Sequence, residues 1–417
     1  MKSKRHPIQF KIAWGILIVL LAGCGQSREP NQNPAEALKQ NLPDHIRQLD
    51  SLTVYRQNSR QQPDTVELIR EQVFESGQDV FIDGLIWKFA VDDSGRVFAS
   101  TSNAGSAAIY IFDSDCEYIT TMATYGHGPG EYESIGTISI QNNKLYMFDA
   151  QMQKIGIYSL KDYEHVKDET LNRDQLTASD SLAKRLRGSS LWATHNEQLV
   201  MGFQSYSLTP EHDLRKIVYH QVDNDGAILP GTLFELKRFR FYFPGNSYPK
   251  DLPMAMPFTR SSLLSVSDDG CFFTAWTEDF LIKEYNADGD YQRAIYYPVK
   301  KSKLHTNELD LGQYKRNLIK NKDLPETWPA LHAMELDDEG RLWVATITDS
   351  DSTYTWWVLS NEGKLLAKFR WSGERASRSV MSTPEIVIKN GYLYKREVDI
   401  RAGINRVAQY RIRFSKQ

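Results

Sequence analysis

The stretch AVDDSGRVF at residues 90–98 decides the fold, because it joins an apolar strand to an aromatic-containing strand through a tight turn. Five further segments repeat this order of apolar run, Asp, Asn or Gly turn and outgoing strand, most of them aromatic-rich and the third weakest: SIQNNKLY at 139–146, WATHNEQLV at 192–200, SVSDDGCFF at 265–273, ELDDEGRLW at 335–343 and VIKNGYLY at 387–394. Asn, Asp and Gly suit such turns because they tolerate positive φ. One hairpin cannot bury its own apolar face, so the six units must stack on one another.

A second hairpin follows the first in several units, with turns at residues 113–115, 286–289 and 360–363. Four strands per unit, repeated six times, predict an all-β fold, the six-bladed β-propeller. The last unit stops at its third strand, residues 407–414. We therefore expect the missing outer strand to come from residues 64–71, which closes the ring and leaves no open sheet edge.

Three segments of the chain resemble a known family. Residues 64–71, residues 91–98 and GHGPGEY at 126–132 resemble the bacterial six-bladed β-propeller lipoproteins, which are similar to NHL-repeat propellers. The resemblance covers about residues 52–414 and implies a cell-envelope propeller with no established common enzymatic activity. The chain departs from the NHL-like pattern at Ser100 and Thr101, where an Asp is common, whereas Asp149 keeps that Asp in the second unit.

The first 23 residues have the composition of a signal peptide. Four basic residues precede or begin the apolar run at 12–20, and LAGC follows at 21–24. Small residues before a cysteine resemble the bacterial lipobox, so we expect Cys24 to be diacylated, for example with palmitate, and to become the mature N-terminus. The apolar run is too short to span a bilayer. We assign 24–63 to a lipid-anchored polar tether, with 52–55 as the candidate for a short ordered piece within it. We assign 64–417 to the propeller, anchored to a membrane of the bacterial cell envelope, with the outer membrane as the expected one.

The charge balance excludes one class of partner. Removal of residues 1–23 leaves 46 Lys and Arg against 53 Asp and Glu, a formal charge of −7. Nucleic-acid-binding proteins usually carry a basic surplus, so we expect no nucleic-acid partner. Cys116 and Cys271 fall in the first and fourth units, too far apart for a disulfide, and we expect both thiols to be free and inert.

The long loops predict a working face. We label the strands of a blade A to D from the axis outward, so that A–B and C–D turns share one face, the short-turn face. The extra sequence falls in B–C loops and D–A connections, which share the other face, the loop-bearing face: 126–134, 202–216, 237–260 and 300–328. Because loops on a rigid scaffold usually carry binding, we expect the ligand on the loop-bearing face.

Two of these insertions have a marked composition. KRFRFYF at 237–243 alternates cations and aromatics, which is typical either of an extra strand packed on the propeller or of a surface for an anionic or sugar ligand. The insertion at 300–328 is rich in Lys, and residues 306–320 have near-helical apolar spacing with Thr306 as the expected N-cap. Its charge is typical of a solvated segment, with anion binding as the alternative.

Motifs for common catalytic and metal chemistry do not occur. The chain has no Gly-x-Ser-x-Gly, His-Glu-x-x-His, Cys-x-x-Cys or phosphate-binding glycine loop. DNDG at 223–226 lacks the Glu that a calcium loop needs at its twelfth position, where Phe234 stands. We therefore expect no metal and no cofactor.

The candidate ligand-binding residues lie before the inner strands, where they should line the axial mouth, and in the glycine-rich connection: Trp87, Lys88, His127, Glu131, Trp192, Arg260, His332 and Glu385. We expect Glu131 to accept backbone hydrogen bonds. The sequence thus predicts a non-catalytic envelope lipoprotein that binds a glycan, a small anionic ligand or an envelope protein. The alternative is a hydrolase, lactonase or lyase at the axial mouth, where His332 would be the candidate base.

Overall fold

A computed structural model of the chain describes residues 42–55, 62–103, 105–194, 198–205, 216–242, 254–309, 311–320, 322–376, 385–399 and 402–416. The chain divides into two compact units, Met1–Arg47 and Gln48–Gln417. In the first unit the described residues form one short helix, α2 (Asp44–Arg47). The signal peptide and Cys24 lie outside the described residues. No helix in the described ranges has the length and apolar character needed to cross a membrane.

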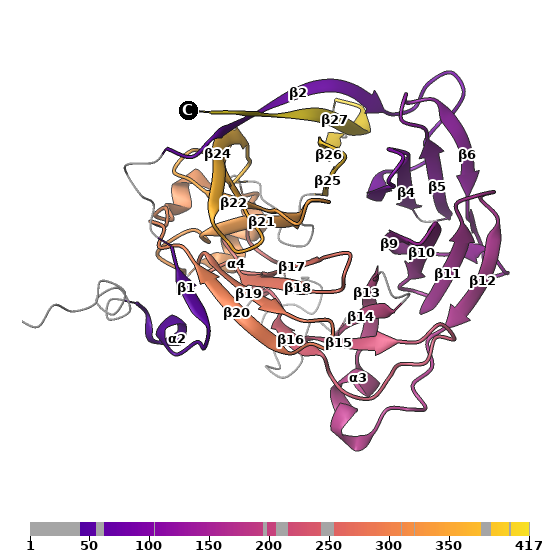
Figure 1. Ribbon diagram of the computed structural model, residues 1–417, viewed down its shortest axis with the longest axis horizontal. Helices are drawn as coiled ribbons and strands as arrows, with labels where there is room; N and C mark the ends of the chain where they lie inside the picture. Colours follow the sequence, from indigo (N-terminus) through magenta and orange to yellow (C-terminus); the bar gives the residue numbers. More distant parts are fainter. Residues whose placement is uncertain are drawn as a thin grey trace, which may run out of the picture. The chain divides into compact units, whose positions relative to one another are not determined.

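The second unit is an all-β six-bladed propeller, as the sequence predicts, and its sheets form a ring (Figure 1). Blade one has strands β3 (Ile86–Val91), β4 (Val97–Asn103), β5 (Ser106–Phe112) and β6 (Tyr118–Met122). Blade two has β9 (Ile135–Gln141), β10 (Lys144–Asp149), β11 (Lys154–Ser159) and β12 (His165–Thr170). Blade three has β13 (Arg187–Ala193), β14 (Leu199–Gln204), β15 (Lys216–Val222) and β16 (Phe234–Lys237).

Two of the other three blades, blades four and six, include a strand from the N-terminal part of the chain. Blade four has β17 (Ser262–Val266), β18 (Phe272–Trp276), β19 (Leu281–Tyr285), β20 (Tyr291–Tyr296) and, as a fifth strand, β1 (Leu52–Val54). Blade five has β21 (Leu331–Leu336), β22 (Leu342–Ile347), β23 (Thr353–Leu359) and β24 (Leu365–Ser372). Blade six has β25 (Ile386–Lys389), β26 (Tyr392–Asp399), β27 (Ile404–Ser415) and β2 (Thr65–Phe74).

The apolar core is divided among the interfaces between blades. The described residues form six buried clusters, and each joins side chains of two neighbouring blades, as Phe98 and Leu145 do between blades one and two. This is the stacking that the repeat requires, because the apolar face of each sheet is covered by the next one. The first strand of each blade lies nearest the axis and therefore lines the centre of the ring.

The ring closes through β2, which pairs antiparallel with β27 along its length, with Val66 opposite Phe414 (Figure 1). The sequence assigned residues 64–71 to this position. β1 pairs parallel with β20, and Tyr55 after it stacks on Tyr297 with ring centroids 5.2 Å apart. The segment 24–63, assigned to a tether, therefore includes an ordered strand on the outer edge of blade four.

The connections contain short additional elements: β7 (Thr124–Tyr125) with β8 (Glu131–Tyr132), η1 (Ala178–Asp180), α3 (Ser181–Arg185), η3 (Thr306–Glu308) and α4 (Gln313–Ile319). The single helix expected over 306–320 is wrong. The chain forms two short helices instead, because Leu309 is extended and Gly312 starts the second helix. Most of the 202–216 insertion and residues 243–253 of the 237–260 insertion lie outside the described residues.

Candidate functional site

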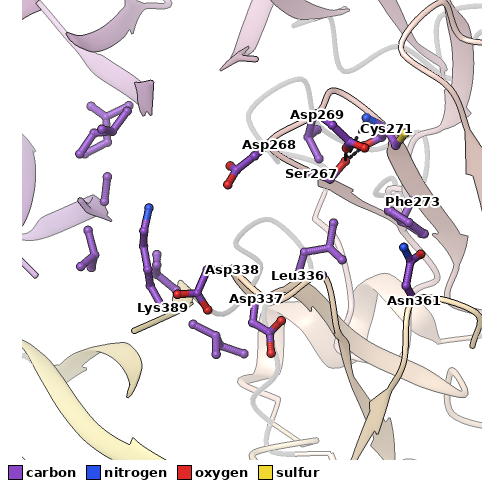
Figure 2. A pocket seen from close by; sticks show the side chains of 18 of the residues that line it. Ser267, Asp268, Asp269, Cys271, Phe273, Leu336, Asp337, Asp338, Asn361 and Lys389 are labelled. Carbon is purple, nitrogen blue, oxygen red and sulfur yellow. Dashed lines mark hydrogen bonds between the residues drawn. The ribbon is translucent and has the colours of Figure 1, made fainter. Parts of the chain in front are cut away.

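An axial cavity of about 500 Å³ opens on the short-turn face (Figure 2). Its walls are apolar side chains of the inner strands, such as Ala90, Ile138 and Val387. Its rim consists of A–B turns from blades four and five and the end of β25 in blade six. The hollow follows from the propeller itself, since the inner strands surround the axis without filling it.

The aspartates at this rim have two different roles. The first Asp of a turn is fixed by its own turn: Asp337 Oδ1 accepts the N–H groups of Glu339 and Arg341, and Oδ2 accepts Trp343 Nε1–H at 2.7 Å. The next residue, Asp338 or Asp268 in its turn, faces the opening instead (Figure 2). In blade four Ser267 takes the turn-fixing position, where its Oγ accepts the N–H of Cys271 at 3.0 Å, so in both turns it is the following Asp that faces the opening.

The rim is acidic but does not form a metal site in the described part of the chain, where no three His, Cys, Asp or Glu side chains lie close enough to hold an ion. Lys389 Nζ lies 2.6 Å from Asp93 Oδ1, and Asp338 accepts the N–H of Asn390 at 2.7 Å. Cys271 also lines the cavity, but burial and the nearby Asp269 raise the pKa of its thiol. Both Cys271 and Cys116 are free thiols, and burial raises the pKa of Cys116 to about 11.

Two of the predicted residues meet inside the ring. Lys88 Nζ lies 2.7 Å from Glu385 Oε2, so a residue of β3 in blade one and the residue before β25 in blade six form an ion pair. Glu335 on β21, which the sequence analysis did not select, lies near both. Burial and then the negative charge of Glu385 raise the pKa of Glu335, and Lys88 opposes this. The signal in the sequence was a Glu in an inner strand whose other residues, apart from His332, are apolar.

Arg260 uses its guanidinium for contacts within the protein. Its guanidinium forms an ion pair with Glu278 at 2.5 Å and donates to the carbonyls of Phe258 and Thr327 and to Thr327 Oγ1. These bonds attach the end of the 300–328 insertion to blade four. Most of the donors of Arg260 are therefore used, which leaves little capacity for a ligand.

Trp192 and His332 pack on aromatic neighbours. The ring centroid of Trp192 lies 5.9 Å from that of Tyr219, and the ring of His332 lies 4.3 Å from that of Tyr354. Trp87, by contrast, is exposed. The structure thus brings Lys88 and Glu385 together but separates the other axial candidates into different surroundings.

The glycine-rich connection at 126–132 is fixed by its own side chains. Glu131 Oε2 accepts the N–H of Gly128 at 2.8 Å, which is the backbone role that the sequence predicts. Tyr132 donates its hydroxyl to Asp168 at 2.6 Å and is fully buried. His127 is 71% exposed and lies 3.1 Å from Glu133. The loop is a tight connection between blades rather than a phosphate cradle.

A second hollow, of about 420 Å³, lies on the loop-bearing face at the interface of blades four and five; we name it the seam pocket. Residues 298–300 and 302 of the connection leaving blade four form one wall. Residues 346–350 at the B–C loop of blade five and the side chains of strands β23 and β24 form the other: Thr353, Thr355, Trp357, Lys368 and Arg370. An adjoining hollow of about 390 Å³ shares Thr355, Lys368 and Arg370 and extends to Thr65.

The seam pocket is polar and cationic where the rest of this blade interface is apolar. Lys368 Nζ lies 4.0 Å from the ring centroid of Trp357, whose Nε1–H donates to Thr346 Oγ1 at 3.1 Å. Burial and the positive charge of Arg370 both lower the pKa of Lys368. The pocket was not predicted from the sequence, because Lys368 and Arg370 alternate along an outer strand in the way that solvent-facing residues do.

The B–C loop that borders the seam pocket is fastened to the insertion by Arg375, which is about 5% exposed. Its guanidinium donates to the carbonyl of Thr348 at 2.7 Å and forms ion pairs with Asp351 at 2.6 Å and Glu308 at 2.7 Å. Buried charges of this kind persist only when their hydrogen bonds are satisfied. The rim of the pocket is therefore held in place by the scaffold.

Comparison with known proteins agrees with the class of fold. Residues 89–233 match the sequence profile of the DUF5128 family, described as "6-bladed beta-propeller". No curated protein matches the chain. The match and the six sheets together identify the chain as a six-bladed β-propeller, the fold of the family that its sequence resembles.

Solved structures are similar to the chain only at the level of the fold. A proposed exported protein of Bacteroides fragilis is 10% identical, with a TM-score of 0.47, and the alignment covers 88% of this chain and 100% of that one. A DUF4221 family member from Bacteroides vulgatus is 7% identical, with a TM-score of 0.49 and coverage of 85% and 100%. An aldose sugar dehydrogenase of Streptomyces coelicolor, bound to PQQ, is 12% identical, with a TM-score of 0.42 and coverage of 84% and 100%.

Proposed function

We propose that this chain is a lipid-anchored propeller of the bacterial cell envelope that binds a ligand on its loop-bearing face without converting it. The observation that carries the proposal is the seam pocket, a polar hollow of about 420 Å³ on that face. Its volume lies in the range of small-molecule sites, which combine a few oriented polar groups with a formed cavity. The short-turn face also has a cavity, but charged groups on its rim are paired with neighbouring blades, as Asp338 is with the N–H of Asn390 and Lys389 with Asp93.

The anchor part of the proposal rests on the sequence of residues 1–24. The basic start, the apolar run and the LAGC segment favour export and lipidation at Cys24. Two or more acyl chains hold a protein on a membrane far more stably than one. We infer that the protein is attached to a membrane of the envelope, and we propose that this is the outer membrane. The polar residues after Cys24 link the anchor to the propeller.

Thermal denaturation of the full chain in mild detergent tests the binding function. We expect at least one member of a panel of acidic glycans, neutral glycans and small anions to raise the melting temperature, because a ligand that binds only the folded state stabilises it by mass action. Calcium belongs in the same panel, and we expect it to leave the melting curve unchanged. If no glycan or small anion shifts the curve, small-ligand binding is wrong, and an envelope protein becomes the partner to seek.

Glu335 favours a second candidate function, a hydrolase at the axial mouth. A carboxyl whose pKa is raised, close to the Glu385 carboxylate, has the arrangement of an acid beside a base. The assay is hydrolysis of nitrophenyl esters, nitrophenyl glycosides and lactones by the full chain and by Glu385→Gln. Turnover that the variant loses would establish the enzyme; absence of turnover would leave the binding function as the better account.

A further inference from the structure

The seam pocket contains two like charges side by side on one strand. Lys368 and Arg370 are two residues apart on β24, so their side chains lie on the same face of the sheet. In the register with β23, Lys368 is opposite Trp357 and Arg370 is opposite Thr355. Both line the pocket and the adjoining hollow. Two neighbouring cations repel each other, so this arrangement costs free energy unless a negative charge lies near.

The protein pairs other cations around this pocket with carboxylates. Arg375 has Asp351 and Glu308, and Lys301 has Glu278 and Asp279. Among the ion pairs of the described residues, none involves Arg370 or Lys300 on the opposite wall. The acidic side chain in the pocket lining is Asp349, which is exposed and is not within ion-pair distance of either. The described residues therefore provide no carboxylate partner for Arg370 or Lys300, the two cations that face each other across the pocket.

Hydroxyl groups border the same cations. Thr346 Oγ1 donates to the carbonyl of Thr355 at 3.0 Å, and Thr348 Oγ1 donates to that of Thr353 at 2.7 Å. Each oxygen also accepts one N–H, Thr346 from Trp357 Nε1 and Thr348 from Ser350, so of its two lone pairs one remains as an acceptor. Trp357 lies beneath Lys368 and holds the ammonium group over its ring, which fixes a flexible side chain in place.

We propose, building on the ligand-binding function above, that the seam pocket binds the anionic group of an acidic saccharide. Arg370 and Lys300 contact its carboxylate or sulfate, and the threonine hydroxyls contact the sugar. A guanidinium binds carboxylate and sulfate through paired N–H donors, which gives the geometric specificity that an ammonium group alone lacks. The volume of the pocket admits one or two sugar residues.

Isothermal titration of the full chain in mild detergent tests this assignment. The probes are a disaccharide of galacturonate, a sulfated disaccharide and a neutral disaccharide, so that carboxylate, sulfate and uncharged sugars are separate arms. The variants are Arg370→Gln, Lys300→Gln and the pair together. Lys161→Gln removes the same charge from an exposed turn of blade two and serves as the control. Melting curves without ligand confirm that each variant is folded.

We expect at least one acidic disaccharide to bind and the neutral one to bind at least tenfold more weakly. Arg370→Gln should lower the affinity for the acidic disaccharide about tenfold or more. The double variant should lose most of the remaining affinity, and Lys161→Gln should behave as wild type. Acidic-sugar binding that survives the double variant would overturn the assignment and leave the binding function intact. Binding of the neutral disaccharide alone would also overturn the assignment and leave the binding function intact. If no sugar binds and the wider panel gives no thermal shift, the binding function fails as well.

Discussion

At the scale of single residues, Asp149 holds two loops of blade two with one carboxylate. Its Oδ2 accepts the N–H groups of Glu133 and Ser134, and its Oδ1 accepts those of Gln151 and Met152, at 2.6 to 3.1 Å. The side chain is fully buried. This is the position where the sequence keeps the Asp of the family pattern, and the structure gives its physical reason.

Removing this carboxylate should destabilise the propeller. We expect Asp149→Ala to lower the free energy of unfolding by about 2 to 4 kcal/mol, because several buried N–H groups lose their acceptor. Chemical denaturation followed by tryptophan fluorescence measures the change. Asp162→Ala, at an exposed turn of the same blade, is the control. Equal stability of the two variants would contradict this account of Asp149.

Glu335 should make stability depend on pH. Its pKa is raised in the folded protein, so its protonated form is favoured there; the stability it contributes is complete below the unfolded pKa and is lost as the pH rises through the folded pKa. Glu335→Gln should therefore match wild type at pH 4 and melt roughly 1 to 3 °C higher at pH 8. A shift of this size corresponds to a change of about 1 kcal/mol in the free energy of unfolding. Melting curves at both pH values test this. If Glu335→Gln instead melts below wild type at pH 8 while matching it at pH 4, this account of Glu335 is wrong.

The sequence predicted individual site residues only in part. Lys88 and Glu385 were both placed at the axial mouth, and they form an ion pair. Arg260 was placed there too, but its partners Glu278 and Thr327 are brought to it by an insertion whose path the repeat pattern does not specify. The seam pocket was missed because its cations become neighbours of residues 298–302 only when blades four and five pack together.

At the scale of elements, β2 is the strand on which closure of the ring depends. It forms the outer edge of blade six and contributes buried Val66 and Phe74 to two different blade interfaces. The prediction of this strand required only that the last repeat lacked one. Residues 52–55 were a candidate for an ordered piece, but the pairing of β1 with β20 and the broken helix at 306–320 were not predicted, because short elements outside the repeat depend on contacts far away in the sequence.

Deletion of residues 64–71 should open the ring. We expect the melting temperature to fall by at least about 5 °C, since the deletion removes buried Val66 and the pairing of β27 along one edge. Differential scanning calorimetry of the full chain and the deletion measures the loss. Replacing the same residues by an eight-residue Gly/Ser segment keeps the chain length and should give a similar loss. An unchanged melting curve would refute closure by β2.

At the scale of the whole molecule, the unit Gln48–Gln417 is a ring whose stability lies in its blade interfaces, and we propose that its function lies in its loops. Six repeats were sufficient to predict the ring, because stacking is the only way to bury each unit. The same repeats do not distinguish the two faces by chemistry. That difference arises from which side chains happen to line each hollow: acidic turns on the short-turn face and a surplus of cations at the seam.

The proposed lipid anchor is also tested at the scale of the whole chain. Cys24→Ser should prevent acylation and processing, so the protein should incorporate no labelled fatty acid, whereas wild type should be labelled. Metabolic labelling with a palmitate analogue followed by detergent-phase partitioning measures both properties. Cys116→Ser is the matched control and should be labelled like wild type. Labelling of the Cys24→Ser variant would contradict the anchor.

The most direct test of the working face is hydroxyl-radical footprinting of the full chain in isolated cell envelopes, compared with the purified chain in detergent. The experiment works without the ligand being identified, because the envelope supplies it. The account predicts protection of residues 298–302 and 346–355 on the loop-bearing face, with the short turns at 268–271 and 337–341 reacting equally in both samples. Protection of the short turns alone would contradict it and move the site to the axial cavity.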